Sequence, residues 1–169
     1  VQLTLTPVVP AAAAKTVDVL VVIDTSASML RRERELKRAV GAALDALVPG
    51  ARFDVAAFDL SARSCFGKLE RLNAKTRRAA MQFVATQRFA YEADPRSLLR
   101  TVGKLRRSSK RPLDAILITD ASLSDSATLL RTLTVKAQGT GVRVFAAELG
   151  SSRAPQAPLA RLAAQTGAL

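Results

Sequence analysis

Two kinds of hydrophobic pattern alternate along the chain. Short, uninterrupted apolar runs predict strands buried on both faces, and longer segments with apolar residues every three or four positions predict helices that cover them. The expected strands are residues 17–23, 52–59, 113–119 and 142–147, and the expected helices are residues 29–47, 74–88, 95–105, 124–137 and 158–164. This alternation is typical of an α/β fold with a doubly wound, mainly parallel sheet and helices on both faces.

Two of the expected helices begin at residues suited to a helix start. Asn73 is an N-cap for the helix that begins at Ala74. Asp94 is an N-cap for the next helix, because Pro95 follows it and proline is favoured in the first helical position.

A single domain with an antiparallel edge is expected. Residues 64–69 follow a turn after the second strand and predict a partner strand that forms an edge hairpin. Residues 1–15 contain two prolines and four consecutive alanines and predict a lead-in strand or linker, so the domain is expected to span residues 16–169. No strand is expected after the last helix, which predicts a domain truncated at its C-terminus and part of a larger multidomain chain.

Composition limits the chemistry that this domain can perform. Among 169 residues there is no histidine and a single cysteine, Cys65, which excludes an internal disulfide and every Ser-His or Cys-His catalytic pair. The sequence contains no run of about 18 apolar residues, so it predicts no transmembrane helix. A site in this protein must therefore rely on oxygen ligands.

The net charge of +12 favours anionic partners. Residues 100–111 hold six lysines or arginines and no acid, and this segment is either a solvated helix face or a surface that contacts an anion. Nucleic acid is a poor candidate, because only 4% of residues are aromatic and single-stranded readers stack bases on aromatic rings.

Two of the expected parallel strands end at an aspartate. Asp24 ends the run VLVVID and Asp120 ends AILITD. In a doubly wound sheet, ligands bind outside the carboxyl ends of the strands, where the strand order reverses, so both carboxylates are expected at one edge. Ser26 and Ser28 follow Asp24 at alternating positions, and such hard oxygen ligands suit Mg²⁺ first, with Mn²⁺ or Ca²⁺ as alternatives.

These segments resemble a known family. VLVVIDTSASM, ARFDVAAFD, LDAILITDAS and GVRVFAAELG resemble the von Willebrand factor type A domain, most closely the version in inter-alpha-trypsin inhibitor heavy chains and their bacterial relatives. The resemblance covers residues 16–166 and implies a Rossmann-like fold. It also implies a metal-ion-dependent adhesion site, in which Asp24, Ser26 and Ser28 form the first loop and Asp120 the third.

The sequence departs from the family pattern at the second loop. The family supplies a threonine there, and the register of FAYEADPRS places Ala93 at that position. A neighbouring acid, Asp94 or Glu92, could replace the threonine as a metal ligand, although Asp94 is also explained as a helix cap. Alanine also replaces the glycine of the family's usual DxSGS and TDG sequences, which requires a backbone without positive φ at both positions.

The function implied by the resemblance is non-enzymatic adhesion or protein binding, in which the bound cation captures a carboxylate of a protein partner. An extracytoplasmic location follows from the resemblance alone. Three alternatives stay open: the site residues act only as turn and helix caps, the metal site has decayed and the basic segment 100–111 binds anions, or Asp24 is a phosphatase nucleophile. The last lacks the second aspartate of such enzymes, because Ser26 stands at that position.

Overall fold

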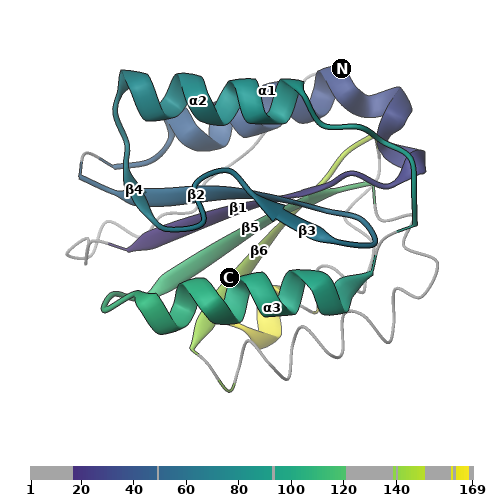
Figure 1. The fold of residues 1–169 in the computed structure, drawn as a ribbon. Helices are drawn as coiled ribbons and strands as arrows, with labels where there is room; N and C mark the ends of the chain where they lie inside the picture. Colours follow the sequence, from purple (N-terminus) through teal and green to yellow (C-terminus); the bar gives the residue numbers. More distant parts are fainter. Residues whose placement is uncertain are drawn as a thin grey trace.

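A sheet of mainly parallel strands lies between two helical layers (Figure 1). The computed structural model describes residues 17–48, 50–92, 94–120, 139, 141–150, 161 and 163–167. The lead-in 1–15 and the helix predicted at 124–137 lie outside the described residues, and so does most of the helix predicted at 158–164. The elements are β1 (Asp18–Asp24), η1 (Ala27–Arg32), α1 (Glu33–Asp45), β2 (Arg52–Phe58), β3 (Ala62–Ser64), β4 (Glu70–Arg71), α2 (Ala74–Ala85), α3 (Pro95–Ser108), β5 (Leu113–Thr119) and β6 (Val142–Glu148).

The strand order is β3-β2-β1-β5-β6, and β4 pairs with β2 outside this path. The β2–β1, β1–β5 and β5–β6 pairs are parallel, and β3 and β4 are antiparallel to β2. The described part of the chain therefore enters the sheet at β1, in its middle, builds one half and then crosses to the other side of β1. This reversal confirms the predicted Rossmann-like, doubly wound α/β fold with an antiparallel edge.

Each face of the sheet packs against its own apolar layer. Leu98 and Leu105 of α3 pack with Leu20, Phe58 and Leu117 on one face. On the other face, α1 and α2 cover the alternate strand positions; the largest fully buried side chains there include Ile23, Met29, Leu36, Leu44 and Phe53. Because the central strands are buried on both faces, they have the continuous apolar sequences that predicted them.

The antiparallel edge differs from its prediction in one respect. The expected strand at 64–69 is divided into β3, which ends at Ser64, and β4, which begins at Glu70. The buried carboxylate of Asp54 accepts hydrogen bonds from the Ser64 hydroxyl and from the backbone N–H of Phe66. Gly67 then turns with a φ of 68°. The chain wraps around this carboxylate, which interrupts its pairing with β2.

Ion pairs between neighbouring strands tie the amino-terminal edge of the sheet. The Arg52 guanidinium donates two hydrogen bonds to the buried carboxylate of Asp18, at 2.9 and 2.5 Å, directly across the β1–β2 register. Arg143 bonds Asp114 in the same way across β5 and β6, at 2.8 and 2.6 Å. These pairs lie at the end of the sheet opposite to Asp24. In the described part of the chain, no helix has the length and apolar character needed to cross a membrane.

Asn73 caps α2 as predicted, and this cap gives a test of local stability. Its side-chain oxygen accepts the N–H groups of Lys75 and Thr76, at 2.9 and 3.0 Å, and the Thr76 hydroxyl accepts the N–H of Asn73 at 3.0 Å. Asn73→Ala should lower the free energy of unfolding by about 1 kcal/mol, measured by urea denaturation. Asn73→Asp keeps the acceptor oxygen and should stay near the wild type; equal losses in both variants would contradict the capping role.

Candidate metal centre

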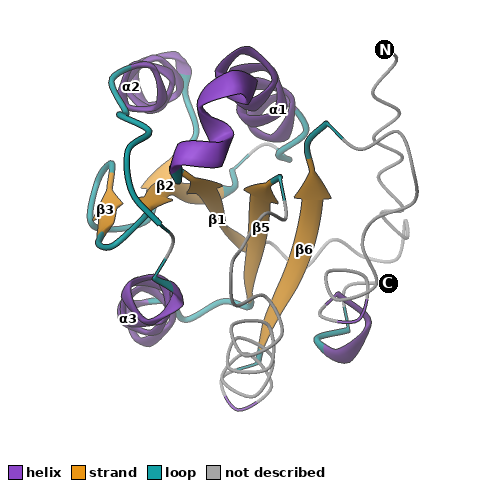
Figure 2. Cartoon of the chain, turned by 90° about the vertical axis from the view of Figure 1, so that its right-hand side faces the viewer, coloured by secondary structure: helices purple, strands orange, loops and turns teal. Residues whose placement is uncertain are grey.

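The two predicted aspartates lie together at the carboxyl edge of the sheet. Asp24 is the last residue of β1, and Asp120 follows the last residue of β5. The two strands are parallel neighbours with Ile23 opposite Ile118, so both acids emerge at the point where the strand order reverses. Figure 2 looks towards this edge, with η1 in front of the strand ends. Both acids thus lie at the edge of the sheet that was predicted from the sequence.

Asp24 is a buried carboxylate held in place on both oxygens. One oxygen accepts the N–H of Ser26 at 2.8 Å, and the other accepts the hydroxyl of Thr119 at 2.7 Å. Burial raises the pKa of Asp24, the Ser26 and Thr119 hydrogen bonds oppose this rise, and the nearby Asp120 carboxylate adds to it. A bound cation would favour the ionised form that burial disfavours.

A chain of side-chain contacts joins the first and third loops. The hydroxyls of Ser26 and Ser28 are 3.1 Å apart, and the Ser28 hydroxyl donates a hydrogen bond to Asp120 Oδ1 at 3.2 Å. Asp24, Ser26, Ser28 and Asp120 are therefore brought into one cluster. Ser28 is exposed and Asp120 is half-buried, so solvent reaches this cluster from outside the sheet.

The spacing of these oxygens suits a hard divalent cation. Neighbouring ligands around an octahedral Mg²⁺ lie about 3 Å apart, because each Mg–O distance is about 2.1 Å. The Ser26–Ser28 and Ser28–Asp120 separations of 3.1 and 3.2 Å are close to this value. Among the described residues, no three acidic, cysteine or histidine side chains cluster as metal ligands, so a cation here would need the serine hydroxyls.

The first loop is shaped by its backbone rather than by helix capping from serine. Ser26 has an extended conformation, with φ −64° and ψ 161°, and its hydroxyl makes no capping bond to η1. The carbonyl of Ser26 accepts the N–H of Met29, whose side chain is fully buried and fixes the start of η1. The capping alternative is therefore wrong for Ser26, whereas Asp24 does bind a backbone amide in its own turn.

The second loop lies beside the first. Tyr91 forms a parallel bridge with Ser26, and its carbonyl accepts the N–H of Ala27 at 3.0 Å. Asp94 directly precedes α3; its N–H donates to the carbonyl of Asp59 at 2.8 Å, and its carbonyl accepts the hydroxyl of Ser97 at 2.7 Å. These are backbone interactions, so a metal-ligand role for the Asp94 carboxylate stays a prediction. Ala93 lies outside the described residues.

Several residues that hold the site residues and the first loop in place were not identified from the sequence. Thr119 holds Asp24 across the β1–β5 pair. Thr25 donates to the Phe58 carbonyl at 3.0 Å and lies 3.3 Å from the Asp59 carboxylate, which is paired with Arg63 at 2.8 Å. The only signal for these residues was a polar side chain at the end of an apolar strand. Their partners depend on strand register, which the pattern does not specify.

Comparison with known proteins agrees with this geometry. The family model for the von Willebrand factor type A domain matches residues 17–168, so the chain belongs to that family. The resemblance expected from the sequence is confirmed at this level. No curated protein matches the chain.

Solved structures share the fold at low sequence identity. A von Willebrand factor type A protein from Catenulispora acidiphila superposes with a TM-score of 0.74 at 24% identity; the match covers 89% of this chain and 37% of that one. The conserved hypothetical protein BatB from Bacteroides thetaiotaomicron has a TM-score of 0.63 at 14% identity, covering 89% and 87% of the two chains. Proximal thread matrix protein 1 from the mussel byssus, described with a zinc-occupied metal-ion-dependent adhesion site, has a TM-score of 0.61 at 16% identity over 86% and 38%.

The Asp59–Arg63 pair behind the first loop gives a pH-dependent test. Burial acts to raise the pKa of Asp59, but hydrogen bonds from Arg63 and the Ser61 N–H, together with the Arg63 charge, lower it below its ordinary value. The pair therefore stabilises the fold above the ordinary carboxyl pKa, and this stability is lost as the pH falls through the lowered value. The Arg63 side chain is 40% exposed, and solvent therefore weakens its contribution to stability. Arg63→Met should lower the free energy of unfolding by about 1–2 kcal/mol near neutral pH, measured by urea denaturation.

The difference between wild type and Arg63→Met should shrink as the pH falls through the lowered pKa of Asp59, because Asp59 is then protonated in both proteins. Arg78→Met, which changes an exposed arginine on α2, serves as the control and should show no such pH dependence. A constant difference at every pH would contradict the role of the ion pair.

Proposed function

We propose that this domain is a non-enzymatic protein-binding module that holds a divalent cation, Mg²⁺ first, and uses it to capture a carboxylate of a protein partner. Asp24, Ser26, Ser28 and Asp120 would hold the ion. The observation that carries the proposal is the hydrogen bond between Ser28 and Asp120, which joins two loops 92 residues apart at the carboxyl edge. When bound, the cation would supply an electrophilic centre for an incoming carboxylate oxygen.

The charge of the proposed ligands supports capture of an external acid. Two carboxylates and two neutral hydroxyls would balance the charge of a divalent ion without exceeding it. Because the site would carry no net negative charge, it would not repel a further carboxylate, which could occupy one of the positions that these four ligands leave open on a six-coordinate ion such as Mg²⁺. The exposed Ser28 marks the side from which that carboxylate would approach.

A non-enzymatic role agrees with the nucleophiles that the chain offers. Burial and the neighbouring Asp54 carboxylate raise the pKa of Cys65 to about 11, so this thiol is protonated near neutral pH. The chain contains no histidine that could activate a serine. Adhesion, a closer kinship with inter-alpha-trypsin inhibitor heavy chains and an extracytoplasmic location belong to the same proposal and rest on the sequence resemblance.

Direct titration with cations tests the proposal. We expect saturable binding of Mg²⁺ and Mn²⁺ to the wild type by calorimetry. Loss of outer-shell metal partners costs about 10–100-fold in affinity, so Ser28→Ala should weaken binding at least about tenfold. Because Ser28 is exposed, the Ser28→Ala variant should fold normally. Asp24→Ala removes a proposed carboxylate ligand and should abolish cation binding.

Ser108→Ala is the matched control, because Ser108 is also an exposed serine but lies at the end of α3. It should bind cations as the wild type does. Absence of saturable binding to the wild type would contradict the proposal, and equal weakening in both serine variants would contradict the position of the site.

The missing threonine of the second loop can be restored. Ala93→Thr adds a hydroxyl at the position where the family pattern supplies one, and we expect it to tighten cation binding about tenfold. Ala93→Val has the same shape without the hydroxyl and should leave the affinity unchanged. Identical behaviour of the two variants in calorimetry would show that the second-loop register is wrong.

A further inference from the structure

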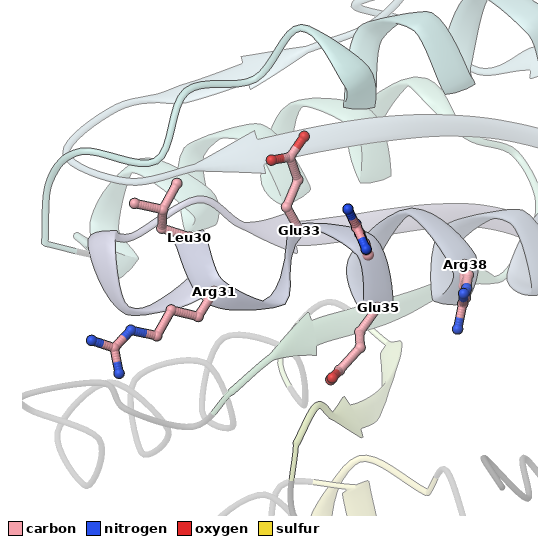
Figure 3. A pocket seen from close by; sticks show the side chains of 6 residues that line it. Leu30, Arg31, Glu33, Glu35 and Arg38 are labelled. Carbon is pink, nitrogen blue, oxygen red and sulfur yellow. The ribbon is translucent and has the colours of Figure 1, made fainter. Parts of the chain in front are cut away.

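A groove of about 520 Å³ runs along η1 and the first turns of α1 (Figure 3). Its lining residues are Leu30, Arg31, Glu33, Arg34, Glu35 and Arg38. Because Leu30 and Arg31 follow Ser28 within the same helical turn, the groove begins beside the candidate metal centre. Figure 3 shows Arg31, Glu35 and Arg38 extending to the same side of this helical segment.

Among the described residues, the positive charge of the groove exceeds its negative charge. Both glutamates are already neutralised, Glu33 by Lys37 at 2.5 Å and Glu35 by Arg32 at 3.4 Å. Arg31, Arg34 and Arg38 are exposed, and none of them forms an ion pair within the part of the chain that the structure describes. With respect to the described part of the chain, three arginine side chains are therefore available to an acidic ligand.

Three exposed apolar side chains lie at the same edge, Leu30 on η1 and Leu60 and Tyr91 in loops. Leu30 and Tyr91 are each 58% exposed, and the Tyr91 backbone is bonded to the first loop. Leu60, 57% exposed, follows Asp59 in the loop whose backbone contacts Asp94. Of these three, tyrosine is the residue type that is enriched among the side chains that dominate binding at protein interfaces, as arginine is.

We propose that the partner of the metal centre is an extended acidic segment of a protein, which continues from the cation over Leu30 and along the three arginines. The segment would place one carboxylate at the cation, an apolar side chain against Leu30 and Tyr91, and further carboxylates beside Arg31, Arg34 and Arg38. This inference rests on the proposed function and adds the chemistry of the partner.

The dimensions of the helix agree with such a segment. Arg31 and Arg38 are seven positions apart, which corresponds to roughly 10 Å along a helix. An extended peptide spans this distance with about three residues. Arginine suits the carboxylates, because its planar guanidinium donates paired hydrogen bonds to them. Nucleic acid fits less well, because the described lining residues of the groove include no aromatic side chain for base stacking.

Fluorescence polarisation with a labelled peptide tests the inference. The probe carries an Asp-Leu pair followed by a short run of glutamates, and its control has glutamine in place of each glutamate. In the presence of Mg²⁺, we expect the combined variant Arg34→Glu and Arg38→Glu to bind the acidic probe about tenfold more weakly than the wild type. The glutamine peptide should bind both proteins with equal affinity.

The control protein is Arg107→Glu, which reverses an exposed arginine on α3, across the sheet from α1 (Figure 1). It should bind the acidic probe within about twofold of the wild type. Equal weakening by the control would show that net charge alone attracts the probe, and unchanged binding by the groove variant would overturn the inference. Tighter binding of a labelled oligonucleotide than of the peptide would overturn the assignment to a protein partner.

Calorimetric titration of the same proteins with Mg²⁺ separates this inference from the function on which it rests. If the groove variant retains cation binding and its affinity for the acidic peptide is unchanged, the inference of an acidic partner segment is wrong, whereas the proposed metal centre is not contradicted. Loss of cation binding in the wild type would overturn the proposed function itself.

Discussion

The hydrogen bond from Thr119 to Asp24 is the contact on which the carboxyl edge depends. It crosses the β1–β5 pair and satisfies one oxygen of a carboxylate that has no access to solvent, while the Ser26 N–H satisfies the other. Without these donors, the buried negative charge would be costly to the fold. The same two donors set the direction in which the first loop leaves the strand, and hence the place of both serines.

The fold could be predicted because its signals are local. Continuous apolar strands and helical periodicity need no knowledge of distant partners, and the Asn73 cap could be recognised within four residues. The division of the edge strand could not be predicted, because it depends on Asp54, a residue of another strand. Its carboxylate, which projects from β2, accepts the Ser64 hydroxyl and the Phe66 N–H of the turn, and only the three-dimensional arrangement brings these groups together.

Some residues of the candidate site could be predicted from the sequence, and others could not. Asp24 and Asp120 could be predicted, because both end apolar strands and parallel neighbours bring such ends to one edge. Ser26 and Ser28 were suggested by spacing, and the contact with Asp120 depends on the direction of the loop. Thr119, Asp59 and Arg63 could not be assigned, since their partners are set by register and by the turn into β3. By contrast, the two positions at which alanine stands in place of the family's glycine could be identified from the sequence alone.

The ion pairs of Asp18 with Arg52 and of Asp114 with Arg143 secure the sheet at the end farthest from Asp24. Strand alignment is thus maintained independently of the loops that would meet a partner. The loops at the carboxyl edge can therefore accept substitutions that alter specificity, while the register of β1 with β2 and of β5 with β6 is held by contacts at the other end.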